Sequence, residues 1–176
     1  LQPETENKQI KIYSIIFLLI LSYIYTIPWD NMMIASGAWS YSDTAVFLTI
    51  WNAPLGEYLF FGIQTIITSL WVYKIGFRTD IYKSDLSNVP KLVGSIVIIL
   101  LMAVLVTKIN VQSYFYLSGI LLWCLPVVFL QWIVGAGYLV NEWKTVLTGI
   151  LPPTLYLSAV DYFAISEGLW LISESH

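Results

Sequence analysis

The chain has 176 residues, of which 58% are hydrophobic and 11% charged, with a formal net charge of -3. So few charged residues do not cover the surface of a water-soluble domain of this length, which excludes an ordinary soluble protein. The single cysteine, Cys124, excludes an intrachain disulfide, and the single histidine, His176, excludes a histidine-rich metal site. A glycine-rich phosphate loop is also absent, so we do not expect a nucleotide-binding domain.

The apolar residues are gathered into five long runs, each bounded by charged or turn-forming residues. A helix of about 20 apolar residues crosses a lipid bilayer, and no soluble core would hide so much apolar surface. We therefore predict an all-α fold: a polytopic integral membrane bundle of five to seven transmembrane helices in a single domain over residues 1–176. The higher numbers allow for a division of the fourth run at Pro126 and for a further helix before Leu1. The runs are Ile12–Ile27, Val46–Tyr73, Leu92–Val106, Tyr114–Val140 and Val146–Ile165.

The basic residues are unevenly distributed between the ends of these runs. Cytoplasmic loops of membrane proteins carry an excess of Lys and Arg. If the fourth run is a single span, we therefore expect the N-terminus and segments 74–91 and 141–145 on the cytoplasmic side, and segment 28–44 and the C-terminus on the other side. A division at Pro126 would move the C-terminus to the cytoplasmic side. The basic residues concerned are Lys8, Lys11, Lys74, Arg78, Lys83, Lys91 and Lys144.

Three acidic residues lie within or at the end of the apolar runs, with no Lys or Arg at a depth that would neutralise them. Asp30 follows the first run, whereas Glu57 and Asp161 are embedded in apolar sequence. A charged side chain at the centre of a bilayer costs roughly 2.5–3.5 kcal/mol even on a lenient scale, so these acids favour their neutral form. A neutral carboxylic acid suits a proton donor. The alternative, an acid at the water interface or in a hydrogen bond between helices, stays open.

Two patterns occur twice in the chain. An Asp is followed by Gly seven residues later and by Trp nine residues later, and a Trp-x-x-Pro element occurs at 51–54 and 123–126. The patterns come in opposite order, so they are not a tandem repeat. They predict two related half-units, of about residues 10–75 and 91–173. The first pattern comprises Asp30, Gly37 and Trp39, and then Asp161, Gly168 and Trp170.

Aromatic residues are concentrated near the acids. Some of them are expected in the belts at the membrane interfaces. Ring faces also stabilise a cation that has no counter-ion, so aromatic residues around a neutral carboxylic acid suit carbocation chemistry on an apolar, isoprenoid-type substrate. Two glutamines could bond to the acids or hold helices together. The candidate substrate-binding residues are Trp29, Trp51, Phe60, Phe61, Gln64, Trp123, Gln131, Trp132 and Tyr156.

Five segments between Ile27 and Ser173 carry a resemblance to a known family. In chain order they read IPWDN, GAWSY, PLGEYLFFGIQT, LPVVFLQWIVG and LPPTLYLSAVDYFAISEGLWLIS. The chain resembles the small membrane carotenoid cyclases, the lycopene cyclase domain of fungi, archaea and some bacteria that is often encoded as two heterodimer subunits. Both half-units would here lie in one chain.

This resemblance implies a redox-neutral isomerisation of a linear carotene such as lycopene, without a cofactor. A carboxylic acid would protonate a terminal double bond, the neighbouring double bond would attack the cation, and a base would remove a proton to leave a β- or ε-type ring. It further implies a prokaryotic cell membrane as the location, and phytoene synthase or other carotenoid enzymes as partners. No nucleic-acid partner is expected.

The resemblance also implies roles for the acids. Glu57 would be the general acid, Asp30 and Asp161 would serve as relay or base, and aromatic residues such as Phe60 would form a cation-stabilising wall. The family block reads Pro-x-Glu-Glu, whereas Gly56 here replaces the first glutamate. If that glutamate is essential, the chain is impaired or is a non-catalytic carotenoid-binding membrane subunit. If Glu57 is the essential acid, activity survives.

Overall fold

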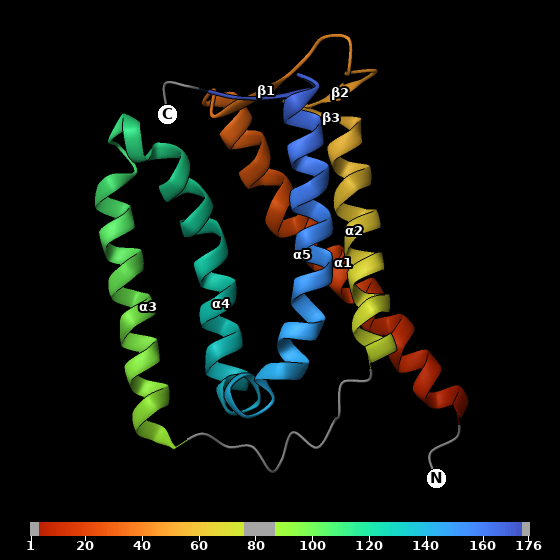
Figure 1. Cartoon of the computed structure of the whole chain (residues 1–176), viewed down its shortest axis with the longest axis vertical. Helices are drawn as coiled ribbons and strands as arrows, with labels where there is room; N and C mark the ends of the chain where they lie inside the picture. Colours follow the sequence, from red (N-terminus) through yellow and green to blue (C-terminus); the bar gives the residue numbers. More distant parts are fainter. Residues whose placement is uncertain (1–3, 76–86, 174–176) are drawn as a thin grey trace. The chain divides into compact units, whose positions relative to one another are not determined.

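The computed structural model describes residues 4–75 and 87–173, with side chains from residue 8 onward. Within these ranges the chain forms five α-helices, four short strands and one 3-10 turn (Figure 1), which confirms the predicted all-α class. Arg78 and Lys83, used in the predicted topology, lie outside the described residues. The elements are α1 (Glu4–Ala35), β1 (Trp39–Tyr41), β2 (Thr49–Ile50), β3 (Ala53–Pro54), α2 (Leu55–Ile75), α3 (Asn88–Lys108), η2 (Gln112–Tyr114), α4 (Phe115–Asn141), α5 (Trp143–Ser166) and β4 (Trp170–Ile172).

Four helical stretches of the described chain are long and apolar enough to cross a membrane, which supports the predicted polytopic membrane class. Each contains at least 21 residues, and a helix of that length rises about 31 Å, close to the thickness of the hydrocarbon core. The fifth predicted run, in α5, is not among them. Its Pro152–Pro153 pair and its Thr and Ser residues interrupt the apolar sequence. The four stretches are Lys8–Ala35, Leu55–Ile75, Asn88–Lys108 and Gln112–Asn141.

The first two helices differ from the predicted runs at the C-terminal end of α1 and the N-terminal end of α2. α1 continues through Pro28 to Ala35, so Asp30 lies inside a helix and not after it. The predicted run Val46–Tyr73 is helical only from Leu55 onward. Asn52 favours a turn, and Ala53 is biased toward extended backbone because it precedes a proline, so residues 49–54 form the β2–β3 hairpin.

Pro126 does not divide α4, contrary to the alternative considered from the sequence. The helix runs from Phe115 to Asn141 and is instead interrupted at Gly135, where the backbone has φ -129° and ψ 19°. A proline is tolerated within a membrane helix because local adjustments can satisfy the hydrogen-bonding groups it frees. Glycine, without a side chain, adopts the irregular conformation at little steric cost.

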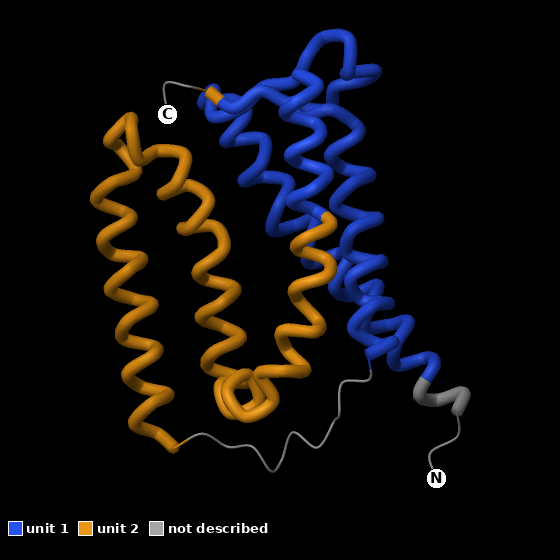
Figure 2. The backbone as a smooth tube through the Cα atoms, in the orientation of Figure 1, with its two compact units in different colours: residues 1–76, 157–172 blue, residues 77–156, 173–176 orange. Residues whose placement is uncertain are grey.

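The chain divides into two compact units (Figure 2). The first comprises Leu1–Gly76 and Leu157–Ile172, and the second comprises Phe77–Tyr156 and Ser173–His176. α5 therefore begins in the second unit and ends in the first. As a result, the chain end of α5, with Asp161 and β4, belongs with α1 and α2.

Within the first unit, α1 and α2 are joined by polar contacts. The Tyr23 hydroxyl donates to the backbone oxygen of Tyr58 at 2.7 Å, and the Thr65 hydroxyl donates to Ser22 Oγ at 3.1 Å. A Cβ at Gly62 would lie 2.5 Å from the Tyr23 hydroxyl oxygen, so the close approach depends on this glycine. Within a membrane the hydrophobic effect does not drive helices together. Small residues and interhelical hydrogen bonds of this kind stabilise their packing instead.

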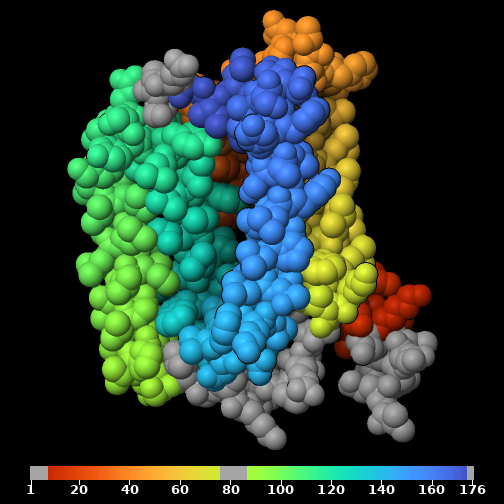
Figure 3. Space-filling model, viewed as in Figure 1, coloured from red at the N-terminus to blue at the C-terminus, as the bar shows by residue number. Residues whose placement is uncertain are grey.

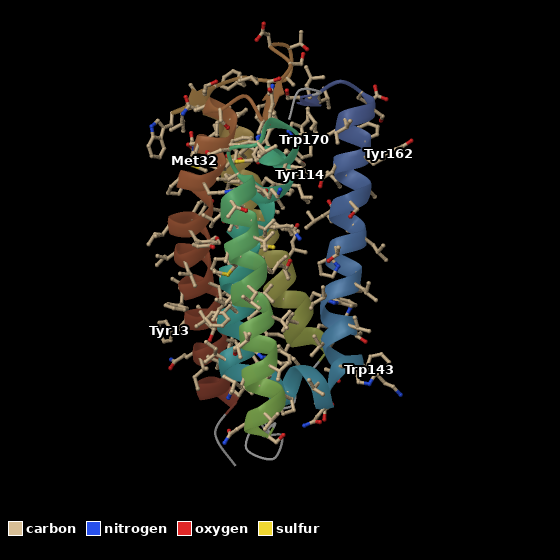
Figure 4. All side chains as sticks on the ribbon, turned by 90° about the vertical axis from the view of Figure 1, so that its left-hand side faces the viewer. Tyr13, Met32, Tyr114, Trp143, Tyr162 and Trp170 are labelled. Carbon is tan, nitrogen blue, oxygen red and sulfur yellow. The ribbon has the colours of Figure 1, made fainter. Side chains whose placement is uncertain are left out.

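Within the second unit, α3 and α4 are held by Trp132. Its indole N–H donates to the backbone oxygen of Lys91 at 3.0 Å, and a Cβ at Gly94 would lie 2.5 Å from its ring. Tyr114 and Trp143 lie at opposite ends of α4 (Figure 4). Lys108 Nζ lies 5.7 Å from the centroid of the Tyr114 ring, and Lys144 Nζ lies 5.7 Å from that of the Trp143 ring. Aromatic residues at both ends are typical of membrane interfaces.

The Asp-Gly-Trp pattern has a structural counterpart in the first unit. α1 and α5 both end before a glycine with positive φ, Gly37 at 77° and Gly168 at 66°, and both continue into a strand. The two strands, β1 and β4, pair antiparallel with Ser40 opposite Leu171 at the centre. The Trp-x-x-Pro pattern has no such counterpart, because residues 51–54 lie in a hairpin and residues 123–126 lie inside α4.

Candidate functional site

The three acids predicted from the sequence come together in the first unit. Asp30 is 3% exposed inside α1, while Glu57 in the first turn of α2 and Asp161 in α5 are half-buried. Asp30 and Glu57 lie close enough for their charges to interact, and so do Glu57 and Asp161. Glu57 therefore occupies the central place among three carboxyl groups that belong to three different helices.

Tyr41 on β1 contacts the central acid directly. Its hydroxyl donates a hydrogen bond of 2.7 Å to Glu57 Oε1. Burial raises the pKa of Tyr41, and the neighbouring charge of Glu57 raises it further. The phenol therefore stays neutral and acts toward Glu57 as a hydrogen-bond donor.

Three tryptophans, here called the tryptophan cluster, lie on or next to the strand that carries Tyr41. The rings of Trp29 and Trp39 lie 5.5 Å apart between centroids, and those of Trp39 and Trp170 lie 6.2 Å apart in an edge-to-face arrangement with an interplanar angle of 82°. Trp29 directly precedes Asp30, and Trp39 is on the same face of β1 as Tyr41 because side chains two residues apart in a strand share a face. The cluster therefore belongs to the same unit as the acids and includes a residue of the strand that carries Tyr41.

Asn31 fixes the backbone that leads into α2. Its Oδ1 accepts hydrogen bonds from the backbone N–H groups of Asn52 and Ala53, at 2.7 and 3.1 Å. Its Nδ2 donates to the backbone oxygen of Ile27 at 2.9 Å and to the Tyr58 hydroxyl at 3.3 Å. Since Glu57 follows this hairpin by a few residues, Asn31 helps to set its position.

The predicted substrate-binding residues of the first unit have different environments. Trp29 belongs to the tryptophan cluster, and Phe60 and Phe61 make an edge-to-face pair on α2 with centroids 6.1 Å apart. Gln64 donates to Thr68 Oγ1 within the same helix at 3.1 Å. Trp51 is 72% exposed at the hairpin turn, with φ 65°.

The surface near the hairpin carries large exposed apolar side chains. Segment 42–51 forms the orange surface at one end of the first unit (Figure 3), with Phe47 and Trp51 among its exposed side chains. Tyr162 points outward from α5 beside Asp161 (Figure 4) and is 76% exposed. Trp51 and Tyr162 thus face the surroundings of the unit, as aromatic residues near a membrane do.

The other predicted residues lie in the second unit. Trp132 packs over Gly94 and bonds to the Lys91 backbone, so it has a structural role there. Trp123 is half-buried in α4, whereas Gln131 and Tyr156 are exposed. The structure describes these residues only within their own unit.

Four residues of the site were missing from the candidates drawn from the sequence: Asn31, Tyr41, Trp39 and Trp170. The two tryptophans were visible in the repeated Asp-Gly-Trp pattern, and Tyr41 is two residues beyond the first of them. A short strand was not predicted there, so nothing indicated that Tyr41 would share a face with Trp39 and reach Glu57. In the described part of the chain, no group of three or more His, Cys, Asp or Glu side chains could hold a metal ion.

The arrangement defines a class of protein. It is a helical membrane protein in which carboxyl groups, a neutral phenol and tryptophan rings meet in one unit. Such a set can donate a proton, stabilise a cation and take a proton back.

Comparison with known proteins identifies relatives of this chain. The chain is 36% identical over 156 residues to lycopene beta-cyclase of Halobacterium salinarum, covering 89% of this chain and 65% of the relative. It is 33% identical over 172 residues to the bifunctional lycopene cyclase/phytoene synthase of Gibberella fujikuroi, covering 94% of this chain and 29% of the relative. The corresponding bifunctional protein of Phycomyces blakesleeanus is 33% identical over 171 residues, covering 92% of this chain and 28% of that protein.

These relatives confirm the resemblance predicted from the sequence: the chain is related to the lycopene cyclase family. It spans 65% of the length of the archaeal relative and less than a third of the fungal ones. No family model matches the chain. No solved structure matches it either.

Proposed function

We propose that this protein is a carotenoid cyclase that forms rings at the ψ ends of lycopene or a related linear carotene, without a cofactor. One observation carries the proposal: the Glu57 carboxyl receives a hydrogen bond from Tyr41 and interacts with Asp30, in the unit that contains the tryptophan cluster. The names of the relatives, lycopene beta-cyclase among them, support the same substrate and reaction.

The proposed reaction is an isomerisation in three steps. Glu57 gives its proton to the terminal double bond of the ψ end, which leaves a tertiary carbocation. The π electrons of a nearby double bond attack this carbon, a new carbon–carbon bond closes a six-membered ring, and the positive charge moves to a ring carbon. A base then removes a proton from a neighbouring carbon, so one proton enters, one leaves, and no electrons are gained or lost.

Asp30 is our proposed base or relay. It is almost completely buried, and its Oδ2 has no hydrogen-bond partner among the described residues. Once Glu57 has given its proton to the substrate, the proton of neutral Asp30 can be shared by the two carboxyl groups, because two like charges in a weakly polar site repel each other. The carboxyl oxygen left without a proton then takes up the proton that the ring carbon releases. Asp161, which also interacts with Glu57, would take a lesser part in the same exchange.

Aromatic rings are proposed to stabilise the cationic intermediates. The faces of aromatic rings attract a cation by about 0.5–2 kcal/mol each, with the larger values where water is excluded. Trp29, Trp39 and Trp170 are the first candidates because their rings are grouped around Trp39, which shares β1 with Tyr41, the donor to Glu57. Phe60 and Phe61 on α2, together with Trp123 of the second unit, remain proposed wall residues.

Glycine at position 56 is compatible with an active enzyme. It is exposed, and a Cβ at this position would meet no atom within 4 Å. Glu57, the next residue, is the one that accepts the Tyr41 hydrogen bond and lies close enough to Asp30 for their charges to interact. We therefore place the essential acid at position 57, which favours an active enzyme over a non-catalytic carotenoid-binding subunit.

We further propose a prokaryotic cell membrane as the location, by analogy with the archaeal relative. Phytoene synthase is a proposed partner, because the names of the fungal relatives join that activity to lycopene cyclase.

The test is to express the chain in a bacterium that accumulates lycopene and to identify the pigments by chromatography. A second strain carries the archaeal lycopene beta-cyclase with its 156 matching residues replaced by those of this chain. Ring-bearing carotenes from either strain would support the proposal. Unchanged lycopene from both, with folded protein in the membranes, would contradict it and support the carotenoid-binding alternative.

A further inference from the structure

We propose that Tyr41 is a positioning residue for Glu57, and that it holds one carboxyl oxygen so that the acidic proton is carried by the other. The inference rests on the proposed function, in which Glu57 is the acid. It adds to the site a residue of β1, a strand that was not predicted from the sequence.

The hydrogen bond between Tyr41 and Glu57 has a defined direction. The Tyr41 hydroxyl lies 2.7 Å from Glu57 Oε1. A neutral carboxylic acid has one hydroxyl oxygen and one carbonyl oxygen, and only the carbonyl oxygen is a strong acceptor. As long as the phenol donates to Oε1, the proton of Glu57 is therefore placed on Oε2.

Other groups near Tyr41 favour the same direction. The indole of Trp39, on the same face of β1, is close enough to influence the Tyr41 hydroxyl. The hydroxyl gives its own proton to Glu57. Among the described residues, the ionisable groups that influence Tyr41 are Glu57 and Asp30, both acidic, so neither favours loss of the phenolic proton.

The backbone around Tyr41 is held on both sides. In the β1–β4 pair, Tyr41 lies opposite Trp170, and the next residue, Ser42, donates its backbone N–H to the Leu169 oxygen at 3.2 Å. The strand follows a tight helix end at Gly37. A group that must orient a reactive side chain is effective when its own position is fixed in this way.

A kinetic experiment separates this role from a general structural one. Tyr41→Phe keeps the ring and removes only the hydroxyl, and we expect kcat to fall roughly 10- to 100-fold with KM changed less than about twofold. Tyr23→Phe is the matched control, because its hydroxyl bonds to a backbone oxygen of the same unit and not to an acid. In a Glu57→Gln background, Tyr41→Phe should change the residual rate less than about twofold, since it acts through Glu57.

An infrared experiment reads the contact without turnover. The carbonyl stretching band of protonated Glu57 is the one that disappears in Glu57→Gln. Loss of a hydrogen-bond donor at the carbonyl oxygen should move this band to higher wavenumber in Tyr41→Phe and leave it in place in Tyr23→Phe.

The outcomes distinguish the role of Glu57 as the acid from the role of Tyr41 as its positioning residue. Full activity of Glu57→Gln would overturn Glu57 as the acid, and with it the positioning role. A slow Glu57→Gln variant beside a Tyr41→Phe variant with unchanged rate and unchanged band would overturn the role of Tyr41 alone. Equal losses from Tyr41→Phe in the parent and in the Glu57→Gln background would also overturn it.

Discussion

Asp30 and Asp161 occupy the same place in two copies of one structural element. Each lies seven residues before a glycine with positive φ, and each helix continues into one strand of the β1–β4 pair. Their surroundings nevertheless differ. Asp30 is 3% exposed, whereas Asp161 is half-buried beside the outward-pointing Tyr162. Equivalent positions have thus acquired unequal environments, and the buried acid is the better candidate for proton transfer.

The first prediction follows from this inequality. Asp30→Asn should lower kcat by at least about 100-fold, in the range typical of a lost acid–base group, and Asp161→Asn by less than about tenfold. Initial rates of ring formation in membrane vesicles would measure both, with protein amounts matched by immunoblot. A larger loss from Asp161→Asn than from Asp30→Asn would contradict the assignment.

The second prediction concerns Asn31, which makes four side-chain hydrogen bonds while 3% exposed. Asn31→Ala leaves several buried groups without partners and should lower the free energy of unfolding by about 2–4 kcal/mol. The control is Asn52→Ala, which removes a single side-chain bond of 3.3 Å to the Asn31 backbone. We expect it to cost less than about 1 kcal/mol. Unfolding in detergent, followed by tryptophan fluorescence, would measure both variants. Equal stability of Asn31→Ala and Asn52→Ala would contradict the role of Asn31.

The third prediction concerns Gly56. Its position has open space for a side chain and is exposed, so Gly56→Glu should be accommodated without loss of stability. Because the new carboxyl does not replace Glu57 in the bond with Tyr41, ring formation should change by less than about threefold. Pigment analysis of strains with equal protein levels gives the comparison. Rings that form only after Gly56→Glu would place the essential acid at position 56.

The fourth prediction tests the packing of α1 against α2. Gly62→Ala adds a methyl group 2.5 Å from the Tyr23 hydroxyl oxygen, which we expect to cost about 1–3 kcal/mol of stability. Gly56→Ala is the matched control on the same helix, and with no atom within 4 Å it should stabilise by about 0.5–1 kcal/mol. Adding Tyr23→Phe to Gly62→Ala removes the closest atom and should recover part of the loss. Equal stability of both alanine variants would contradict the close helix contact.

Much of the fold could be predicted from the sequence because its largest signal is physical and simple. Long apolar runs predict membrane helices, and α3 and α4 correspond closely to the expected Leu92–Val106 and Tyr114–Val140. Helix ends were less predictable. The residues before Leu55 are as apolar as the helix that follows them. They nevertheless form a hairpin, because Pro54 restricts the preceding residue to extended backbone and Asn52 favours a turn.

The site was predicted in part for a related reason. An acid inside an apolar run is conspicuous because placing its charge within a membrane costs free energy. Asp30, Glu57 and Asp161 could be selected for that reason. Tyr41 and Asn31 carry no such signal, because tyrosine and asparagine are ordinary near a membrane surface. Their importance comes from contacts with residues 16 and 21 positions away in the chain, which periodicity does not reveal.

The central claim is that Glu57 donates the proton that starts ring closure, and Glu57→Gln tests it most directly. The measurement is the initial rate of ring formation from lycopene in membrane vesicles, with Glu167→Gln, an exposed acid of the same unit, as the control. We predict a fall of at least about 100-fold for Glu57→Gln and a change of less than about twofold for the control. A Glu57→Gln rate within about threefold of the parent would contradict the claim.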